Sequence, residues 1–105
     1  MAHLTWTGPA LAQLDAIADF IALDKPEVAK AVVRRIFQTT DQVAHFSRLG
    51  RPVPEFPHPL YRQVWLKPCW IYYRIEEKNI FVLHVRRAEK PFRIEDLLGV
   101  NDDPA

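Results

Sequence analysis

Two segments in the first half of the chain carry apolar residues at the spacing of a helix with one buried face. The first segment runs to about residue 23, and its apolar positions are Leu11, Leu14, Ala18 and Ile21. The second segment begins near Pro26, and its apolar positions are Val28, Val32, Ile36, Val43 and Phe46. Because only a few residues connect the two segments, the pattern predicts an antiparallel helix hairpin.

In the second half of the chain, residue types alternate with the two-residue period of β-strands. Residues 60–87 are rich in aromatic and β-branched residues and are interrupted only at Lys67-Pro68 and at residues 76–79, which suits tight hairpin connections. In two of the expected strands Ile71, Tyr73 and Ile75 alternate with Trp70, Tyr72 and Arg74, and Phe81, Leu83 and Val85 alternate with Val82, His84 and Arg86. The pattern predicts three antiparallel strands with one face on the helices and an aromatic, basic face opposite.

Shorter patterns complete the expected architecture. Alternation at residues 3–7 predicts a short strand before the helices, and four prolines within residues 49–59 predict an extended connector after them. A helical turn is expected at residues 94–98, followed by a frayed tail over residues 99–105. We therefore expect one α+β domain over the whole chain, with a core of about residues 3–93. In this fold a short N-terminal strand and an antiparallel helix hairpin pack on a three- to four-stranded antiparallel sheet.

Composition narrows the class of protein. A chain of 105 residues has room for one core, and no segment approaches the roughly 18 consecutive apolar residues that a membrane span needs. The N-terminus lacks the pattern of a secretory signal, so we expect a cytoplasmic protein. The single cysteine, Cys69, lies in an aromatic strand and is expected to be a small buried apolar residue instead of a nucleophile. The histidines have no metal-ligand spacing, and no cofactor site is expected.

The net charge of +1 hides an uneven distribution. Residues 1–59 hold six basic and six acidic side chains, whereas residues 60–93 hold eight basic and three acidic ones. Four acidic residues follow from Glu95 onward. The strand half is therefore basic and would attract an acidic protein segment or a nucleic acid, although a solvated strand face without a partner is the alternative.

Short phrases along residues 3–93 resemble the RelE/ParE superfamily of bacterial toxins, and most of all its ParE branch, often called plasmid stabilisation proteins. These phrases are Trp6-Thr7, Ala29 with Ile36, Gly50-Arg51-Pro52, Tyr61-Arg62, Ile71-Tyr72-Tyr73-Arg74 and Val85-Arg86-Arg87. The resemblance implies the toxin of a type II toxin–antitoxin pair that inhibits DNA gyrase. It also implies an acidic antitoxin that wraps the toxin, with a toxin homodimer or a toxin–antitoxin heterotetramer as possible assemblies.

The superfamily also contains ribosome-dependent messenger-RNA endonucleases of the RelE type, which are the alternative function. Such cleavage needs cations and a general base around the scissile phosphate. Arg62 retains one basic position of those enzymes, but Val64, Ile71 and Phe92 stand where further polar groups are expected. His84 lies inside the last strand and is interpreted as structural. No catalytic residue is therefore assigned, and a domain that keeps only a binding role is a second alternative.

The remaining arginines and tryptophans are interpreted as contacts with partner proteins, because these residue types contribute heavily to interface energy. The candidates are Arg62, Trp65, Trp70, Arg74, Arg86 and Arg87. Arg86 and Arg87 are adjacent in a strand and should point to opposite faces, so that each meets either a partner or an acidic group of its own chain. Tyr72 could join these contacts, and a groove on the helix hairpin near Leu14, Ile21 and Val32 is a second possible surface.

Overall fold

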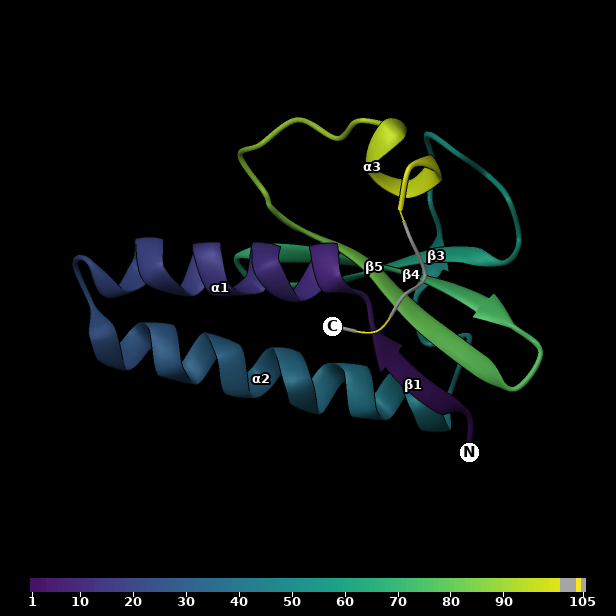
Figure 1. Cartoon of the computed structure of the whole chain (residues 1–105), viewed down its shortest axis with the longest axis horizontal. Coiled ribbons are helices and arrows are strands. Elements are labelled where there is room, and N and C mark those ends of the chain that lie inside the picture. Colours follow the sequence, from purple (N-terminus) through teal and green to yellow (C-terminus); the bar gives the residue numbers. More distant parts are fainter. Residues whose placement is uncertain (101–103, 105) are drawn as a thin grey trace.

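A helix pair and a five-stranded sheet make up most of the molecule in the computed structural model, which describes residues 1–100 and Pro104 (Figure 1). The elements in chain order are β1 (His3–Trp6), α1 (Gly8–Ala22), α2 (Pro26–His45), β2 (Arg51–Pro52), β3 (Tyr61–Leu66), β4 (Cys69–Glu76), β5 (Asn79–Arg87) and α3 (Glu95–Leu98). Helices α1 and α2 run side by side, and their connected ends project beyond the sheet (Figure 1). The expected α+β fold is confirmed.

The order of strands in the sheet is β1-β5-β4-β3-β2. Strands β3 to β5 form the predicted antiparallel meander, but β1 runs parallel to β5, and β2 adds an antiparallel edge of two residues within the proline-containing connector. The sheet is therefore larger than the three to four strands expected. The connector remains irregular elsewhere, because proline has no amide hydrogen to give to a strand ladder.

Thr7 joins the first strand to the first helix. Its hydroxyl donates a hydrogen bond of 2.7 Å to the carbonyl of Val82 in β5 and accepts one of 3.3 Å from the amide of Ala10. The second bond caps the N-terminus of α1, where Pro9 occupies a position whose amide would have no partner. This side chain fixes where α1 leaves the sheet.

The main core lies between the helix pair and one face of the sheet. Its buried members are Ala10, Leu14, Ile17, Val32, Ile36, Cys69, Ile71, Val82 and Val85. Leu4 and Trp6 of β1 pack against this cluster, as the alternation of residues 3–7 predicted. Leu14, Val32 and Ile36 of the predicted helix stripes lie in this core as expected, but Val28 and Phe46 are 46% and 69% exposed, because Val28 is in the first turn of α2 and Phe46 follows its last residue.

One feature of β5 differs from the prediction. Tyr72 pairs with His84 and Tyr73 pairs with Val82, so Leu83 is an extra residue that forms a β-bulge. Leu83 and His84 consequently lie on the face away from the helices, while Val82 and Val85 both belong to the helix-side core. The predicted alternation of Phe81, Leu83 and Val85 was wrong because a bulge interrupts the two-residue period.

The other face of the sheet carries a second, smaller core. Val53 of the connector and Leu97 of α3 are buried there with Tyr72 and Leu83, and Phe92 packs beside them. Tyr72 is 1% exposed, so it belongs to this core and is not an exposed contact. The predicted helical turn near residues 94–98 is confirmed as α3, whereas the tail predicted over 99–105 falls largely outside the described residues.

Candidate partner-binding surface

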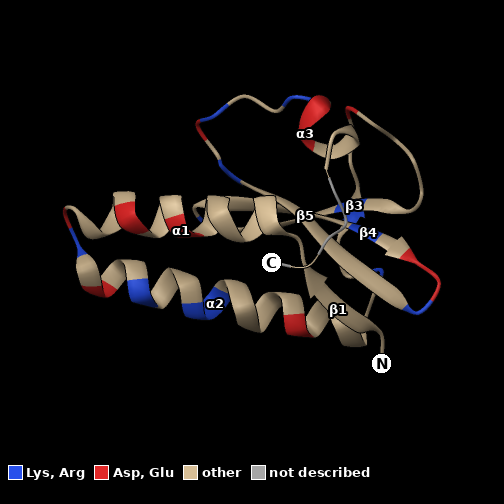
Figure 2. Ribbon diagram, in the orientation of Figure 1, with Lys and Arg blue, Asp and Glu red and all other residues tan. Residues whose placement is uncertain are grey.

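Basic residues gather in several places: on α2, at the point where β3 and β4 lie together, and along the segment after β5 (Figure 2). The prediction of a basic strand half therefore corresponds to several places in the fold. Burial and internal contacts separate those side chains that support the fold from those that are available to a partner.

Arg62 is 8% exposed and serves the fold. One of its terminal nitrogens donates a hydrogen bond of 2.9 Å to the carbonyl of Gly50, while its Nε is buried without a partner among the described residues. Tyr73, directly opposite on β4, donates to the carbonyl of Ser47 at 2.7 Å and accepts from the amide of Gly50 at 2.9 Å. Arg62 and Tyr73 thus hold the chain where it leaves α2 for the connector.

Arg86 is also bound by its own chain. Its Nε and one terminal nitrogen both donate to the hydroxyl of Tyr72, at 3.0 and 2.9 Å, and its other terminal nitrogen donates to the carbonyls of Ala88 and Lys90. These bonds shape the turn that follows β5. Burial raises the pKa of Tyr72, and the hydrogen bond and charge of Arg86 oppose that rise.

Arg74 and Arg87 each combine an ion pair with an aromatic contact. Arg74 lies 3.0 Å from a carboxylate oxygen of Glu76 and faces the ring of Phe81. Arg87 lies 3.2 Å from Glu89 and places its guanidinium 4.0 Å from the ring centre of Phe20 on α1. Arg86 and Arg87 therefore point to opposite faces, as predicted, and both have internal contacts.

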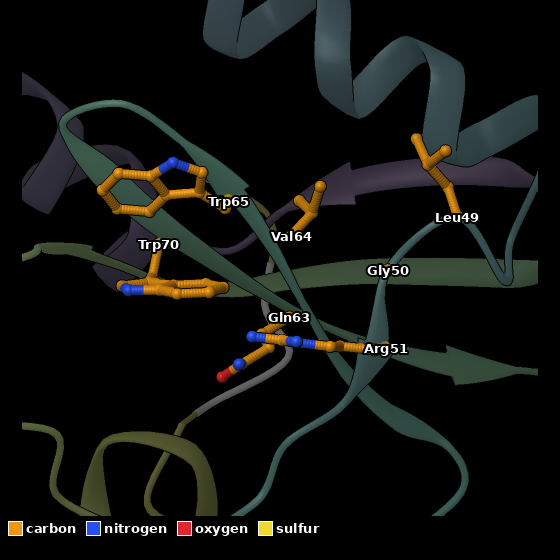
Figure 3. A pocket seen from close by; sticks show the side chains of 7 residues that line it. All are labelled: Leu49, Gly50, Arg51, Gln63, Val64, Trp65 and Trp70. Atoms are coloured by element: carbon orange, nitrogen blue, oxygen red, sulfur yellow. The ribbon is translucent and has the colours of Figure 1, made fainter.

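Trp65 and Trp70 form the wall of a cleft at the β3 edge of the sheet (Figure 3). Their ring centres are 5.0 Å apart, and Trp65 is 46% exposed. The cleft has a volume of about 440 Å³ and is lined by Leu49, Gly50, Arg51, Gln63, Val64, Trp65 and Trp70. We call it the tryptophan cleft. Of the six predicted contact residues, Trp65 and Trp70 are the two that line it.

Sequence patterns did not single out three of the residues that complete the tryptophan cleft. Arg51 places its guanidinium carbon 5.6 Å from the ring centre of Trp70, and Leu49 is 47% exposed at the other end (Figure 3). Gln63 of β3 lies beside Arg51 (Figure 3). The one signal in the sequence was the Gly50-Arg51-Pro52 phrase, which brings an arginine to the sheet edge immediately before a proline.

The residues compared with the RelE-type active site do not gather into one. Ile71 is fully buried in the helix-side core, and Val64 packs against the same core. Phe92 packs on the ring of Tyr72, with ring centres 5.2 Å apart. The positions where phosphate cleavage would need polar groups therefore serve packing.

His84 lies beside this second core. Its Nε2 is 3.6 Å from a carboxylate oxygen of Asp96, and its Nδ1 is buried without a partner among the described residues. Burial lowers the pKa of His84; the Asp96 carboxylate opposes this effect, and the Arg86 charge adds to it. The largely enclosed imidazole joins β5 to α3, and its burial favours the uncharged form.

The helix hairpin carries a second cleft. Leu14 and Val32, which were expected near such a groove, are core residues. The surface cleft has a volume of about 420 Å³ and is lined instead by Ala18, Asp19, Ala22, Pro26, Ala29, Lys30, Val33 and Arg34. Small side chains on both helices produce this cleft.

Cys69 is buried, and burial raises the pKa of its thiol to about 11. Within residues 1–100, no three His, Cys, Asp or Glu side chains come together in a way that could hold a metal ion. No helix in this part of the chain combines the length and apolar character needed to cross a bilayer.

Comparison with known proteins gives the family. The model of the family described as "ParE toxin of type II toxin-antitoxin system, parDE" matches residues 4–92. The chain belongs to this family. It is also similar to "Toxin RelE2" of Caulobacter vibrioides, with 29% identity over 90 residues that cover 86% of this chain and 99% of that protein.

A solved structure supports the same assignment. The chain described as "Chromosomal ParDE TA system from P. aeruginosa" is 31% identical and superposes with a TM-score of 0.71, over 85% of this chain and 98% of that chain. The protein is thus a ParE-family toxin of a type II toxin–antitoxin system, and the match extends over both the helix pair and the strands of the meander.

Proposed function

We propose that this ParE-family toxin acts in the cytoplasm by binding DNA gyrase and is neutralised by a cognate acidic antitoxin. The observation that supports binding over cleavage is the placement of Ile71 and Val64, which pack in the helix-side core where a nuclease would need cations. Arg62 and Arg86 are held by hydrogen bonds to their own chain. The exposed Trp65 instead has the character of an interface residue.

An antitoxin partner is favoured by the family and by charge. The structure of similar fold bears the description of a ParDE toxin–antitoxin system. In this chain residues 60–93 carry eight basic and three acidic residues, which would attract an acidic partner. Association with such a partner would hold the toxin inactive until the antitoxin is removed.

Controlled induction in a bacterial host, followed by assays with purified proteins, tests the proposal. We expect growth arrest with DNA-damage signalling, and inhibition of supercoiling or trapping of cleaved DNA when the purified chain is added to gyrase. A transcript with a stop codon in place of Leu4 controls for effects of the RNA. Unaffected gyrase together with codon-periodic messenger cleavage would assign the chain to the ribosome-dependent nucleases, and absence of any growth effect would reject toxicity.

A further inference from the structure

A further cleft lies between α1 and the segment that follows β5, which forms an arch before it reaches α3 (Figure 1). The cleft has a volume of about 410 Å³. Four of its lining residues are basic, namely Arg86, Arg87, Lys90 and Arg93, and one, Asp96, is acidic. We call it the cation cleft. Such an excess of one charge around a hollow attracts ions of the opposite sign.

Three of these cations have no carboxylate within ion-pair distance in the described part of the chain. They are Arg86, Lys90 and Arg93. The fourth, Arg87, lies 3.2 Å from Glu89, and the Asp96 carboxylate lies 3.6 Å from the ring of His84. The positive field of the cleft is therefore open to an anion from outside the chain.

Hydrogen bonds hold the arched segment at both ends. At its start the guanidinium of Arg86 donates to the carbonyls of Ala88 and Lys90. At its far end the amide of Asp96 donates to the carbonyl of Arg93 at 2.9 Å. The exposed side chains of Lys90 and Arg93 therefore extend from a backbone that is already positioned, so a ligand that they bind loses less affinity to the ordering of the chain.

The opposite wall of the cleft is apolar apart from one amide. Ala16 and Ile17 of α1 line this side, and Pro91 lines the side of the arched segment. The side-chain oxygen of Gln13 accepts a hydrogen bond of 2.8 Å from the amide of Val85. This bond orients the Gln13 amide so that its NH2 group is a further donor. The cleft therefore combines cations, one neutral donor and an apolar surface.

We propose that the cation cleft binds an organic phosphate monoester of about the size of a mononucleotide. The phosphate would lie between Lys90 and Arg93, and the organic part would pack against Ala16 and Pro91. A phosphate monoester carries about 1.5 to 2 negative charges at pH 7 and three strong acceptor oxygens. It therefore pairs with several cations at once, and arginine can bind it through two parallel hydrogen bonds.

Size and charge favour this ligand over two other anions. The volume of the cleft lies within the range of roughly 300–1,000 Å³ that is usual for small-molecule sites. A nucleic-acid backbone carries one charge per phosphate and gains affinity from cations placed along a groove, whereas these cations surround one hollow. A single carboxylate has one charge and two oxygens, so it would leave most of the cations without a partner.

The inference does not depend on the target of the toxin, because the test uses the purified chain alone. The probe is AMP, with adenosine and cyclic AMP as matched controls, since adenosine lacks the phosphate and cyclic AMP carries it as a diester. Calorimetry measures binding, and amide NMR shifts locate the ligand. We expect AMP to bind about tenfold or more tightly than either control, with shifts at residues 13–17 and 84–93.

A DNA strand of about ten nucleotides distinguishes two sources of the phosphate. The strand is used once with a 5′-phosphate and once with a 5′-hydroxyl. Binding of AMP without binding of either strand would support a free nucleotide as the ligand. Binding of the phosphorylated strand alone, at the strength of AMP or above, would support the end of a nucleic-acid strand as the source of the same monoester.

Four variants make the test specific. Arg93→Gln and Lys90→Gln remove exposed cations without a change in the core, and each should weaken binding of AMP about fivefold or more. Gln13→Glu keeps the acceptor for the amide of Val85 but adds a negative charge to the wall, so it should also weaken binding. Arg34→Gln removes one charge from α2, outside the cation cleft, and should leave binding unchanged.

Several results would overturn the proposal. Adenosine or inorganic phosphate that binds as tightly as AMP would exclude recognition of an organic phosphate. Unchanged binding of AMP to Arg93→Gln and Lys90→Gln would place the ligand elsewhere, and an equal loss in Arg34→Gln would show a response to net charge alone. Tighter binding of both DNA strands than of AMP would assign the cleft to a nucleic-acid backbone. Tighter binding of a short glutamate peptide would assign it to an acidic protein segment.

Discussion

Arg62 and Tyr73 face each other across β3 and β4, and together they hold Gly50 by both of its backbone groups. The guanidinium donates to the glycine carbonyl, and the phenol oxygen accepts from the glycine amide. Burial raises the pKa of Tyr73, which further favours the protonated phenol that donates to the carbonyl of Ser47. This cross-strand pair sets the position of the chain at the start of the connector.

Gly50→Ala should destabilise the protein. The added methyl group would lie 2.6 Å from the carbonyl oxygen of Gln63 and 2.9 Å from the Tyr73 hydroxyl, so backbone must move. We expect a loss of about 2–3 kcal/mol in the free energy of unfolding, measured by urea denaturation. Gly8→Ala is the matched control, because nothing lies within 4 Å of that position and it begins a helix. An unchanged midpoint for Gly50→Ala would contradict the close approach.

Tyr73→Phe should remove two hydrogen bonds without a change in ring packing. The amide of Gly50 and the carbonyl of Ser47 would both lose their partner. We expect a loss of about 1–3 kcal/mol in the same measurement. Tyr61→Phe is the control, since the hydroxyl of Tyr61 makes no hydrogen bond within the described residues. Equal losses in the two variants would show that the Tyr73 network contributes nothing specific.

Stability should fall in mild acid because of His84. Burial lowers its pKa in the folded state below the unfolded value of about 6.5. Protons therefore bind the unfolded chain more readily, and the contribution of His84 is complete above that pH and declines as the pH drops below it. Urea midpoints measured from pH 7.5 to 5 should show the decline, and His84→Gln should flatten it.

Asp96→Asn should have the opposite effect to His84→Gln on the loss of stability in acid. The Asp96 carboxylate raises the pKa of His84, so its removal should lower that pKa further and deepen the loss of stability in acid. NMR titration of the His84 ring would report the shift directly. A higher pKa in the variant would contradict the assigned contact.

Cys69 should resist thiol reagents in the native protein. It is fully buried in the helix-side core, and its pKa is about 11, so very little thiolate exists at neutral pH. Labelling with a maleimide should be negligible until denaturant unfolds the chain, and complete afterwards. Rapid labelling of the folded chain would place Cys69 near the surface and contradict the described core.

Periodicity alone predicted most of the fold. The two helices, the alternation in β4 and the two hairpin turns appear where the patterns placed them, although Val28 and Phe46 at the ends of the second helix stripe are exposed. The bulge at Leu83 was not predictable, because an extra residue in a run of apolar residues leaves no mark on composition. The two-residue pairing of Arg51 and Pro52 was equally hidden, since a strand so short has no period.

The candidate site was predictable only in part. Trp65 and Trp70 were named as contacts, and both line a surface cleft. Arg62 was named with them, but its guanidinium is buried against Gly50. Sequence patterns show which face of a strand a residue occupies and not what covers that face. Gln63, which lines the same cleft, was missed for the same reason.

The bulge in β5 also decides how residue roles can be transferred between relatives. It shifts every later position of the strand by one, which sends Arg86 to Tyr72 and Arg87 to Phe20. A relative that lacked the extra residue would exchange the two arginines across the sheet while keeping the same letters in the same order. An alignment of the two sequences would then match arginines whose side chains have different neighbours. Residues after position 83 in two relatives are therefore equivalent only when their strand register agrees as well as their sequence.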